Sequence, residues 1–505
     1  MAGIGFELKK MFDQRGVLAL TRAYGYAGIV CVGPMILGVA LLAGVRLLAL
    51  GAGATRDEAE LLNSMITYTL LYSLFLANSL ALVLTRYSAD EIYLNRADYI
   101  LPSFWGSTTL LLLPGALSYG VFLHFAGISL PEQLLCFILL GELILVWTQI
   151  TYLTAIKDYR GILLAFLCGL LLAWLVGWLL LTYLALPLIP VLLFTVGLAY
   201  GVMLLWYNHL LTRYFPKGHC SSLYFLSWLD RYPQLFWIGL LISVGLFGHL
   251  VIMWASPLQK QISGWFYGTP QYDVPALIAF FSILVTTVSF VTSVEVNFYP
   301  QYRNYFSLFN DGGALVDIRQ AQQEMTTTLI RELTYTFIKQ LFSTILFIIL
   351  GTLILPQLPL GFNDDMLGIY RVLCLGYAFY ALGNALMLIL LYFANDRAAL
   401  TATAVFAFSS CLLTWLWRQD NRLAGLGFLA GSLAFTLTGL LLLRRYLNHL
   451  IFNILCSQPV VIRPRQGWLS RLGNWAQRRY LVRYPRQQTD FDDDRLAQMD
   501  GKEKG

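Results

Sequence analysis

The stretch LLCFILLGELILVWTQITY, residues 134–152, decides the fold. A helix of about 20 apolar residues crosses the ~30 Å hydrocarbon layer of a membrane, and this stretch is of that length. Strands of a membrane barrel would instead alternate apolar and polar residues over about ten positions. Inside the membrane every backbone N–H and C=O must bond within the protein, so the stretch predicts an α-helix.

Similar runs fill most of the chain. Only 12% of the 505 residues are Asp, Glu, Lys or Arg, against about 25% in soluble domains, and the mean hydropathy is +0.65. We therefore predict an all-α, multi-pass membrane protein with about twelve spans. Two pairs of runs are separated only by 186–187 and 418–423, and each pair can also be read as one span. The predicted spans are 22–48, 62–85, 102–125, 133–153, 161–185, 188–207, 233–255, 275–296, 336–355, 368–393, 398–417 and 424–444.

Lys and Arg residues favour one side of the predicted membrane. They gather in the N-terminal segment, in alternate loops and in the tail, whereas the opposite loops carry only Arg56, Lys260, Arg418 and Arg422. Because positive residues are retained in the cytoplasm, we expect both termini there. The apolar run of the first span and its leader are both too long for a cleaved signal peptide.

The predicted spans divide six and six about one cytoplasmic stretch. Because six is even, both halves enter from the same side, and any structural repeat would be parallel, about an axis along the membrane normal. We expect these parts: an amphipathic N-terminal segment (1–21), a six-helix bundle (22–207), a cytoplasmic linker (208–232), a second six-helix bundle (233–446) with a cytoplasmic helix (299–334), and a tail (447–505).

The tail begins with a basic segment and ends in an acidic one that is typical of disorder. A basic helix with a Trp and Leu face is expected to lie in the membrane interface, where anionic lipids attract it. Docking to an acidic cytoplasmic partner is the alternative. The candidate lipid-binding or partner-binding residues are Trp468, Arg471, Trp475, Arg478 and Arg479.

The chain lacks the motifs of transport ATPases and of metalloproteases. It contains no G-x-x-x-x-G-K-[ST] phosphate loop and no H-E-x-x-H motif, and its seven cysteines show no zinc-site spacing. No predicted cytoplasmic segment is long enough for a glycosyltransferase domain. We therefore expect no enzyme activity, no cofactor, no metal and no nucleic-acid partner. We expect a conduit whose transport is driven by an ion gradient, by a partner protein or by polymerisation of the substrate.

Glu142 is the outstanding polar residue inside a predicted span. It lies near the middle of residues 134–152, and Gln149 lies two turns away on the same face. Ionisable residues at this depth are costly and usually face a partner or a wet cavity. Glu142 is therefore either a cavity or proton-coupling carboxylate, or a protonated group that bonds between helices.

Four further polar residues complete the candidate translocation path. Arg46 and Arg371 lie near the extracytoplasmic ends of the first and tenth spans, where they either snorkel or line an outer vestibule. Asn78 and Asn384 lie deeper, where they either bond between helices or contact sugar hydroxyls.

Glycine and proline mark points of bending and of close packing. Gly33-Pro34 predicts a kink and a candidate hinge, because proline lacks an N–H and clashes with the carbonyl four residues back. The spacings Gly197–Gly201 and Gly427–Gly431 are GxxxG patterns, which we interpret as close packing within the protein.

Several stretches together resemble the Pel exopolysaccharide transporter family (PelG-type). The most specific stretch is N-terminal, and the resemblance extends over essentially the whole chain. The stretches are Met1-Ala-Gly-Ile-Gly-Phe-Glu-Leu8, Arg22-Ala-Tyr-Gly-Tyr-Ala-Gly28 with Gly33-Pro34, Leu84-Thr-Arg-Tyr-Ser-Ala-Asp90, Tyr232-Pro233 with Ile238-Gly239-Leu240, Tyr272-Asp273-Val274-Pro275, and Glu295 with Phe298 and Tyr302.

The resemblance implies a fold and a function. It implies a member of the multidrug/oligosaccharidyl-lipid/polysaccharide (MOP) flippase superfamily, with two six-helix bundles around a central cavity. Its implied role is to move the N-acetylgalactosamine-rich Pel polymer across the bacterial inner membrane for the biofilm matrix. Its implied partners are a cytoplasmic glycosyltransferase and membrane subunits that include a cyclic di-GMP receptor. The chain departs from the family at residues 247–250, where members carry charges and this sequence has only His249.

Three functions therefore stand beside each other. The first is a polysaccharide-translocating subunit of a Pel-type synthase complex, which provides a pathway and performs no bond chemistry. The second is an ion-coupled exporter of drugs or of lipid-linked oligosaccharides, with Glu142 as the proton carrier. The third is a scaffold that anchors cytosolic enzymes through residues 299–332 and the tail.

Overall fold

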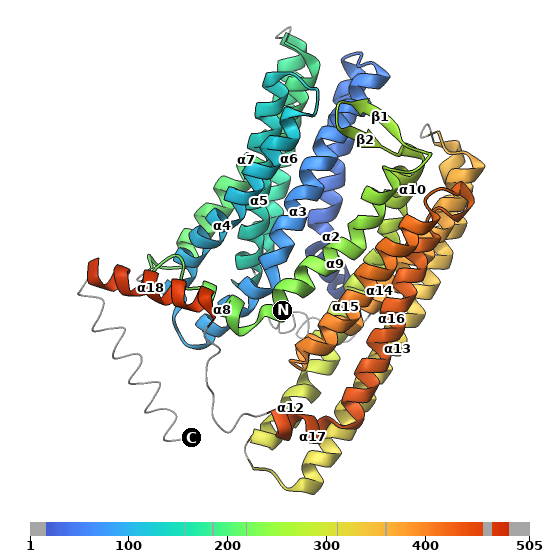
Figure 1. Cartoon of the computed structure of the whole chain (residues 1–505). Helices are drawn as coiled ribbons and strands as arrows, with labels where there is room; N and C mark the ends of the chain where they lie inside the picture. The colour runs from blue at the N-terminus through green and yellow to red at the C-terminus, as the bar shows by residue number, and fades with distance from the viewer. Residues whose placement is uncertain are drawn as a thin grey trace.

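The computed structural model describes residues 17–156, 158–183, 186–218, 220–310, 312–358, 361–457 and 467–483. Two lobes of long helices lie side by side (Figure 1). The first sixteen residues and those after Arg483 lie outside the described ranges, and with them most of the predicted amphipathic N-terminal segment and the acidic end.

The N-lobe consists of six long helices. They are α2 (Val17–Gly51), α3 (Arg56–Tyr93), α4 (Ile100–His124), α5 (Leu130–Ile156), α6 (Tyr159–Tyr183) and α7 (Leu188–Tyr214), with a short 3₁₀ turn, η1 (Ala97–Tyr99), before α4. Each coincides with one of the first six predicted spans, although the predicted ranges 102–125 and 161–185 extend one and two residues beyond α4 and α6. The linker that follows α7 includes the short helix α8 (Leu226–Arg231).

The C-lobe is less regular because its second span is broken. Its elements are α9 (Pro233–Met253), the hairpin β1 (Lys260–Ser263) and β2 (Phe266–Gly268), α10 (Pro270–Phe280), η2 (Phe281–Ile283), α11 (Leu284–Thr292), the π-turn η3 (Ser293–Phe298), α12 (Tyr299–Asn310), α13 (Leu315–Ile354), η4 (Leu355–Gln357), α14 (Asp364–Tyr392), α15 (Asp396–Trp417), η5 (Asn421–Leu423), α16 (Leu426–Asn448) and α17 (Leu450–Ser457). The tail forms α18 (Trp468–Arg483).

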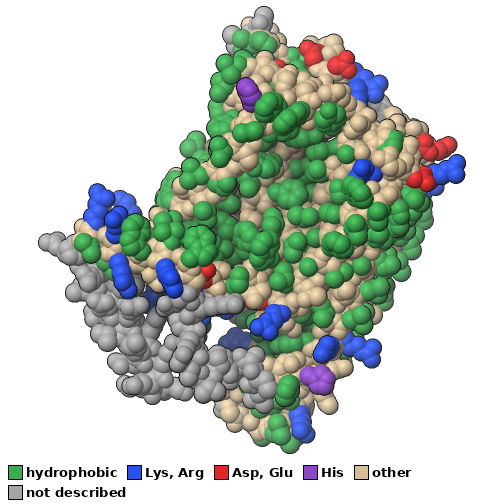
Figure 2. All heavy atoms as spheres, viewed as in Figure 1, with side chains coloured by type: hydrophobic (Ala, Val, Ile, Leu, Met, Phe, Trp, Pro, Cys, Tyr) green, Lys and Arg blue, Asp and Glu red, His purple; other side chains and the backbone are tan. Residues whose placement is uncertain are grey.

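The prediction of an all-α membrane protein is confirmed. Among the described residues, eleven helical segments are long and apolar enough to cross a membrane. The remaining predicted span, 22–48, lies within α2, whose part Ile36–Gly51 is a shorter apolar helix by the same criterion. On the face shown in Figure 2, apolar side chains are spread over both lobes, as expected for a surface that faces lipid.

The two lobes repeat the same packing, helix for helix. In the N-lobe α2 packs on α6, α3 on α5, α4 on α5, α5 on α7 and α6 on α7. In the C-lobe α9 packs on α15, α10 on α14, α13 on α14, α14 on α16 and α15 on α16, the same pairs six spans later. Between the lobes, α3 contacts α9 and α2 contacts α11. This pattern is that of parallel repeats related by an axis along the bundle.

Residues 270–310 change helix type four times, and hydroxyl side chains supply a physical reason. Thr287 donates to the carbonyl of Ile283 at 3.1 Å, and Thr292 donates to that of Val288 at 2.8 Å. Such back-bonding draws a carbonyl away from the helix ladder and bends the helix. A π-turn within a helix is frequent at functional sites. Beyond it, a turn at 312–314 with Gly312 at φ +73° separates α12 from α13, so the range of the expected cytoplasmic helix, 299–334, contains two helices.

Candidate functional site between the lobes

The lobes meet along α3 and α9, which we call the seam. At its middle, Asn78 of α3 donates from Nδ2 to Ser243 Oγ of α9 at 3.0 Å. Gly239 lies beside this bond, and a Cβ there would stand 2.2 Å from the Asn78 carbonyl oxygen. A glycine is therefore needed for the close approach, which gives the Ile238-Gly239-Leu240 stretch a physical role. Asn78, a predicted path residue, lies at the seam.

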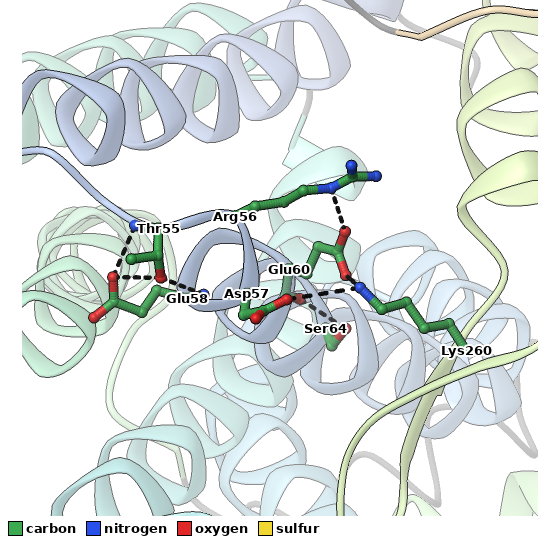
Figure 3. A network of polar contacts seen from close by, with 7 residues as sticks. All are labelled: Thr55, Arg56, Asp57, Glu58, Glu60, Ser64 and Lys260. Carbon is green, nitrogen blue, oxygen red and sulfur yellow. Dashed lines mark hydrogen bonds and ion pairs between the residues drawn. The ribbon is translucent and has the colours of Figure 1, made fainter.

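One end of the seam, the hairpin end, is fastened by charge. Lys260 on β1 forms an ion pair with Glu60 of α3 and lies 3.8 Å from Asp57 (Figure 3). Glu60 also accepts from Arg56 at 3.1 Å. Thr55 and Glu58 form a capping box that fixes the start of α3 in front of the hairpin. Lys260 thus joins a C-lobe strand to an N-lobe helix.

Backbone and aromatic contacts reinforce this end. The Tyr68 hydroxyl donates to the Tyr267 carbonyl at 2.8 Å and accepts from the Tyr267 N–H at 3.1 Å. Its ring stacks on Trp254, with 4.4 Å between centroids. Ser263 Oγ donates to the carbonyl of Gly127, at the end of α4, at 3.0 Å. We call the hairpin with these contacts and the Lys260 ion pair the latch.

The other end of the seam, the linker end, joins two of the stretches quoted for the family resemblance. Arg86 pairs with Asp90 at 3.1 Å on α3, and its guanidinium lies 5.3 Å from the ring centroid of Tyr232. Trp228 of α8 donates from Nε1 to Asp90 Oδ2 at 2.9 Å. The stretches 84–90 and 232–233 therefore hold α3 to the start of α9.

Two clusters of polar side chains, missed in the sequence analysis, flank the seam. In the C-lobe, Gln340 of α13 is fully buried, donates to Thr344 Oγ1 at 2.9 Å and accepts from Thr286 of α11. Nearby, Lys339 donates to Ser289 Oγ at 3.1 Å. Gln340 lies inside the predicted span 336–355, and its amide in an apolar run was the available signal.

The N-lobe cluster occupies the equivalent helices. Thr69 of α3 lies 2.7 Å from the hydroxyl of Tyr119 on α4. One turn along α3, Tyr72 bonds Ser118, and Trp147 of α5 donates to Ser73 Oγ at 3.0 Å. The helices α3 and α11, which contact α9 and α2 of the other lobe, therefore each carry a row of hydroxyls on the side that faces their own lobe.

Glu142 and Gln149 both lie against α7, within the N-lobe and away from the seam. Gln149 Nε2 donates to the Leu204 carbonyl of α7 at 3.2 Å. The Glu142 carboxyl lies in the space left by Gly197 and Gly201, whose Cβ positions would be 3.4 and 3.2 Å from its oxygens. Glu142 Oε2 has no hydrogen-bond partner among the described residues. The first GxxxG pattern thus makes room for a carboxyl group.

The remaining predicted path residues are not brought to the same place. Arg371 of α14 donates from Nε to Thr352 Oγ1 of α13 at 3.2 Å, a contact within the C-lobe. Arg46 is an exposed residue of α2, and Asn384 is half-buried on α14. At the candidate hinge, a Cβ on Gly33 would stand 2.4 Å from Leu163 Cδ2 of α6, so α2 packs tightly there. The α2 backbone is helical through Pro34, whose side chain is outside the described set.

His249 and the 272–275 stretch form a buried joint in the C-lobe. His249 is fully buried, its Nδ1 lies 2.8 Å from the Tyr272 hydroxyl, and its ring centroid is 4.1 Å from that of Phe428. Asp273 accepts from Trp254 Nε1 at 3.1 Å and from the Thr269 N–H at 3.0 Å. These bonds fix α10 to the end of α9, next to the latch.

Solved transporter structures share this fold of two repeated six-helix lobes that meet at a seam. The solved structures that resemble the chain include an outward-facing multidrug resistance MATE family transporter of the MOP superfamily (13% identity, 84% of this chain, 96% of that chain, TM-score 0.56). They also include a MATE structure in complex with MaL6 (12% identity, 84% of this chain, 97% of that chain, TM-score 0.57). A third is a MOP superfamily transporter from Pyrococcus furiosus (14% identity, 84% of this chain, 96% of that chain, TM-score 0.54).

The family follows from the sequence comparison. The PelG family, described as exopolysaccharide exporters (EPS-E), matches residues 1–454, and the chain belongs to it. A comparison with curated proteins gives no match. Family and fold support a flippase role for a polysaccharide or a lipid-linked sugar, and they point to a transporter rather than a catalytic enzyme. They also imply involvement with exopolysaccharide synthesis machinery.

Proposed function

We propose that the chain translocates Pel exopolysaccharide, an N-acetylgalactosamine-rich polymer, from the cytoplasm to the periplasm across the bacterial inner membrane. The observation that carries this proposal is the match of the exopolysaccharide exporter family to residues 1–454. In this role the protein works with a cytoplasmic glycosyltransferase and with membrane subunits that include a cyclic di-GMP receptor. Both termini face the cytoplasm, so the hairpin end faces the periplasm.

The polar clusters support a sugar polymer as the cargo. A neutral polysaccharide needs hydroxyl and amide partners along its path and few fixed charges. The Asn78 amide and the Ser243 hydroxyl at the seam provide such partners between the lobes, and the hydroxyl rows lie inside the lobes on α3 and α11, the helices that border the other lobe. The polymer moves between the lobes when the seam opens. The glycosyltransferase adds sugar units to the polymer at the cytoplasmic side, and this polymerisation supplies the driving force.

The latch is the contact that must release at the periplasmic side. It can be locked by Gly127→Cys with Ser263→Cys, because the Cβ position of residue 127 lies 3.3 Å from Ser263 Oγ, which fits a disulfide. We expect exported polymer to fall to below about a tenth of wild type once the bond forms. A reductant should restore export. The measurement is cell-surface N-acetylgalactosamine polymer at matched protein level.

The two single-cysteine variants are the controls. Gly127 has φ +69°, so Gly127→Cys alone carries about 1–2 kcal/mol of backbone strain, and its export is the reference. Full export from a chain in which the bond has demonstrably formed would show that the polymer does not need the lobes to part at the hairpin end.

A second candidate is an ion-coupled exporter of lipid-linked oligosaccharides or drugs. It is favoured by the Glu142 carboxyl, which has one oxygen without a partner among the described residues and space beside two glycines. The variant Glu142→Gln separates the two candidate functions. Polymer export is also measured for Arg46→Ala, a variant of a second candidate path residue. Polymerisation-driven export predicts near-normal polymer from Glu142→Gln, whereas proton coupling predicts its loss and a dependence on the pH gradient in vesicles without the glycosyltransferase.

A further inference from the structure

The tail helix α18 docks on the linker through its polar face. Asp230 of α8 accepts from the Ser470 N–H at 2.6 Å, so a linker carboxylate caps the start of α18. Gln477 Oε1 accepts from the Ser221 N–H at 2.7 Å. A Cβ on Gly473 would stand 3.1 Å from the Leu223 carbonyl oxygen, so the two backbones lie close.

The outer face of α18 is the apolar one. Ser470, Gly473, Gln477 and Leu481 are buried, whereas Trp468 is 71% exposed, Trp475 is 50% exposed and Val482 is 80% exposed. Helical spacing places these two sets on opposite sides. Apolar burial is the main driving force of packing, yet neither tryptophan of α18 is buried against the linker. The exposed Trp468, Trp475 and Val482 therefore indicate a second, apolar partner on the outer face.

Charge and orientation identify the partner. All four arginines of α18 are exposed and flank the apolar side chains, and the Arg479 guanidinium lies 4.3 Å from the Trp475 ring centroid. The helix lies across the direction of the spans, at the linker end beside α8 (Figure 1). Its basic groups stand next to apolar ones in the space-filling view (Figure 2). The four residues are Arg471, Arg478, Arg479 and Arg483.

We propose that α18 lies in the interface of the cytoplasmic leaflet, with its Trp side chains among acyl chains and its arginines on anionic headgroups. An in-plane helix with this composition binds anionic membranes. Because α18 also caps onto Asp230 and bonds Ser221, it ties the linker that joins the two lobes to the leaflet surface. This inference does not depend on the nature of the cargo.

The test uses the full chain in lipid nanodiscs. An environment-sensitive fluorescent amino acid is placed at Val482, and its matched control is placed at Val316, a valine that is 75% exposed on the first turn of α13. The discs contain nitroxide-labelled lipid, with or without phosphatidylglycerol. We expect quenching at 482 in phosphatidylglycerol discs at least about twice that in phosphatidylcholine discs, and little quenching at 316 in either.

Variants separate the two sources of attraction. The double variant Arg478→Gln with Arg479→Gln should lower the equilibrium constant for binding of α18 to the anionic disc surface roughly 30-fold. Each basic residue contributes a factor of about five to that constant. Asp230→Ala removes the cap while the outer face of α18 stays intact, so quenching at 482 should persist.

Equal and weak quenching at 482 and 316 in anionic discs would overturn the proposal. The proposal would also be overturned, in favour of a protein partner, if the fluorophore at 482 were shielded from water only after a cytosolic fraction is added.

Discussion

The two GxxxG patterns occupy equivalent helices of the two lobes, yet they have different neighbours. Gly427 and Gly431 of α16 lie against the α15 backbone, and their Cβ positions would be 2.4 Å from Thr414 N and 2.6 Å from Ser410 Cα. Gly197 and Gly201 of α7 face only the end of the Glu142 side chain. The same spacing thus brings two helices into contact in the C-lobe and makes room for a carboxyl group in the N-lobe.

The contrast shows that a pattern of small residues leaves space beside a helix but does not determine which group fills that space. In the C-lobe the space is filled by a neighbouring backbone, which cannot move without separating the helices. In the N-lobe it is filled by the end of a flexible side chain, which can turn away. The lobes share their packing scheme, but the two patterns face different neighbours: the C-lobe glycines face α15, the counterpart of α6, whereas the N-lobe glycines face Glu142 on α5.

The largest expected effect on stability is the difference between adding a methyl group to the C-lobe pattern and adding one to the N-lobe pattern. Gly431→Ala should destabilise the protein by about 1–3 kcal/mol, because its Cβ meets the α15 backbone. Gly201→Ala is the matched control, and it should stay within about 0.5 kcal/mol of wild type, because alanine favours the helix and only a side chain must shift. Thermal unfolding in detergent measures both. Equal losses would show that both glycines serve helix contact alone.

A smaller effect is expected where the lobes meet. In a double-mutant cycle, Asn78→Ala and Ser243→Ala should show a coupling of about 0.6 kcal/mol, the average for hydrogen bonds between membrane helices. Asn78→Ala combined with Ser432→Ala, a buried serine of α16, is the control and should be additive. Additivity of the seam pair would mean that Asn78 and Ser243 do not hold the lobes together.

The smallest expected effect on stability is at the latch. Lys260 is 46% exposed, and pairs of this kind contribute about 0.2–1 kcal/mol, less at high salt. Lys260→Gln should therefore barely change unfolding, but it should slow disulfide formation between cysteines at 127 and 263 at low salt. Arg56→Gln removes a charge from the same Glu60 without touching the hairpin, and it should leave that rate unchanged. Equal rates in both variants would remove Lys260 from the latch.

The spans could be predicted because their signal is local. Each predicted range falls on one helix or one helical segment, since about 20 consecutive apolar residues identify a span without knowledge of its neighbours. The equal division into lobes followed from counting those runs. The family was also within reach of the sequence, because its stretches are short, contiguous motifs.

The candidate site was harder to predict because its contacts join distant residues. Nothing local connects Lys260 to Glu60 or Asn78 to Ser243, so the latch and the seam were not foreseen. Six path residues were singled out by their polarity in apolar runs, yet only Glu142 and Gln149 face the same helix, α7. Gln340 carried the same signal and was passed over.

The sequence by itself determined which segments are helical, which of them are apolar enough for the membrane, and which family the chain belongs to, because these properties depend on composition over short runs. Only the tertiary structure decided which polar groups meet. The pairing of Glu142 with two glycines, the latch between the lobes and the outward face of α18 all depend on how helices approach one another. That approach is set by the fit of many side chains at once, and no single stretch of sequence specifies it.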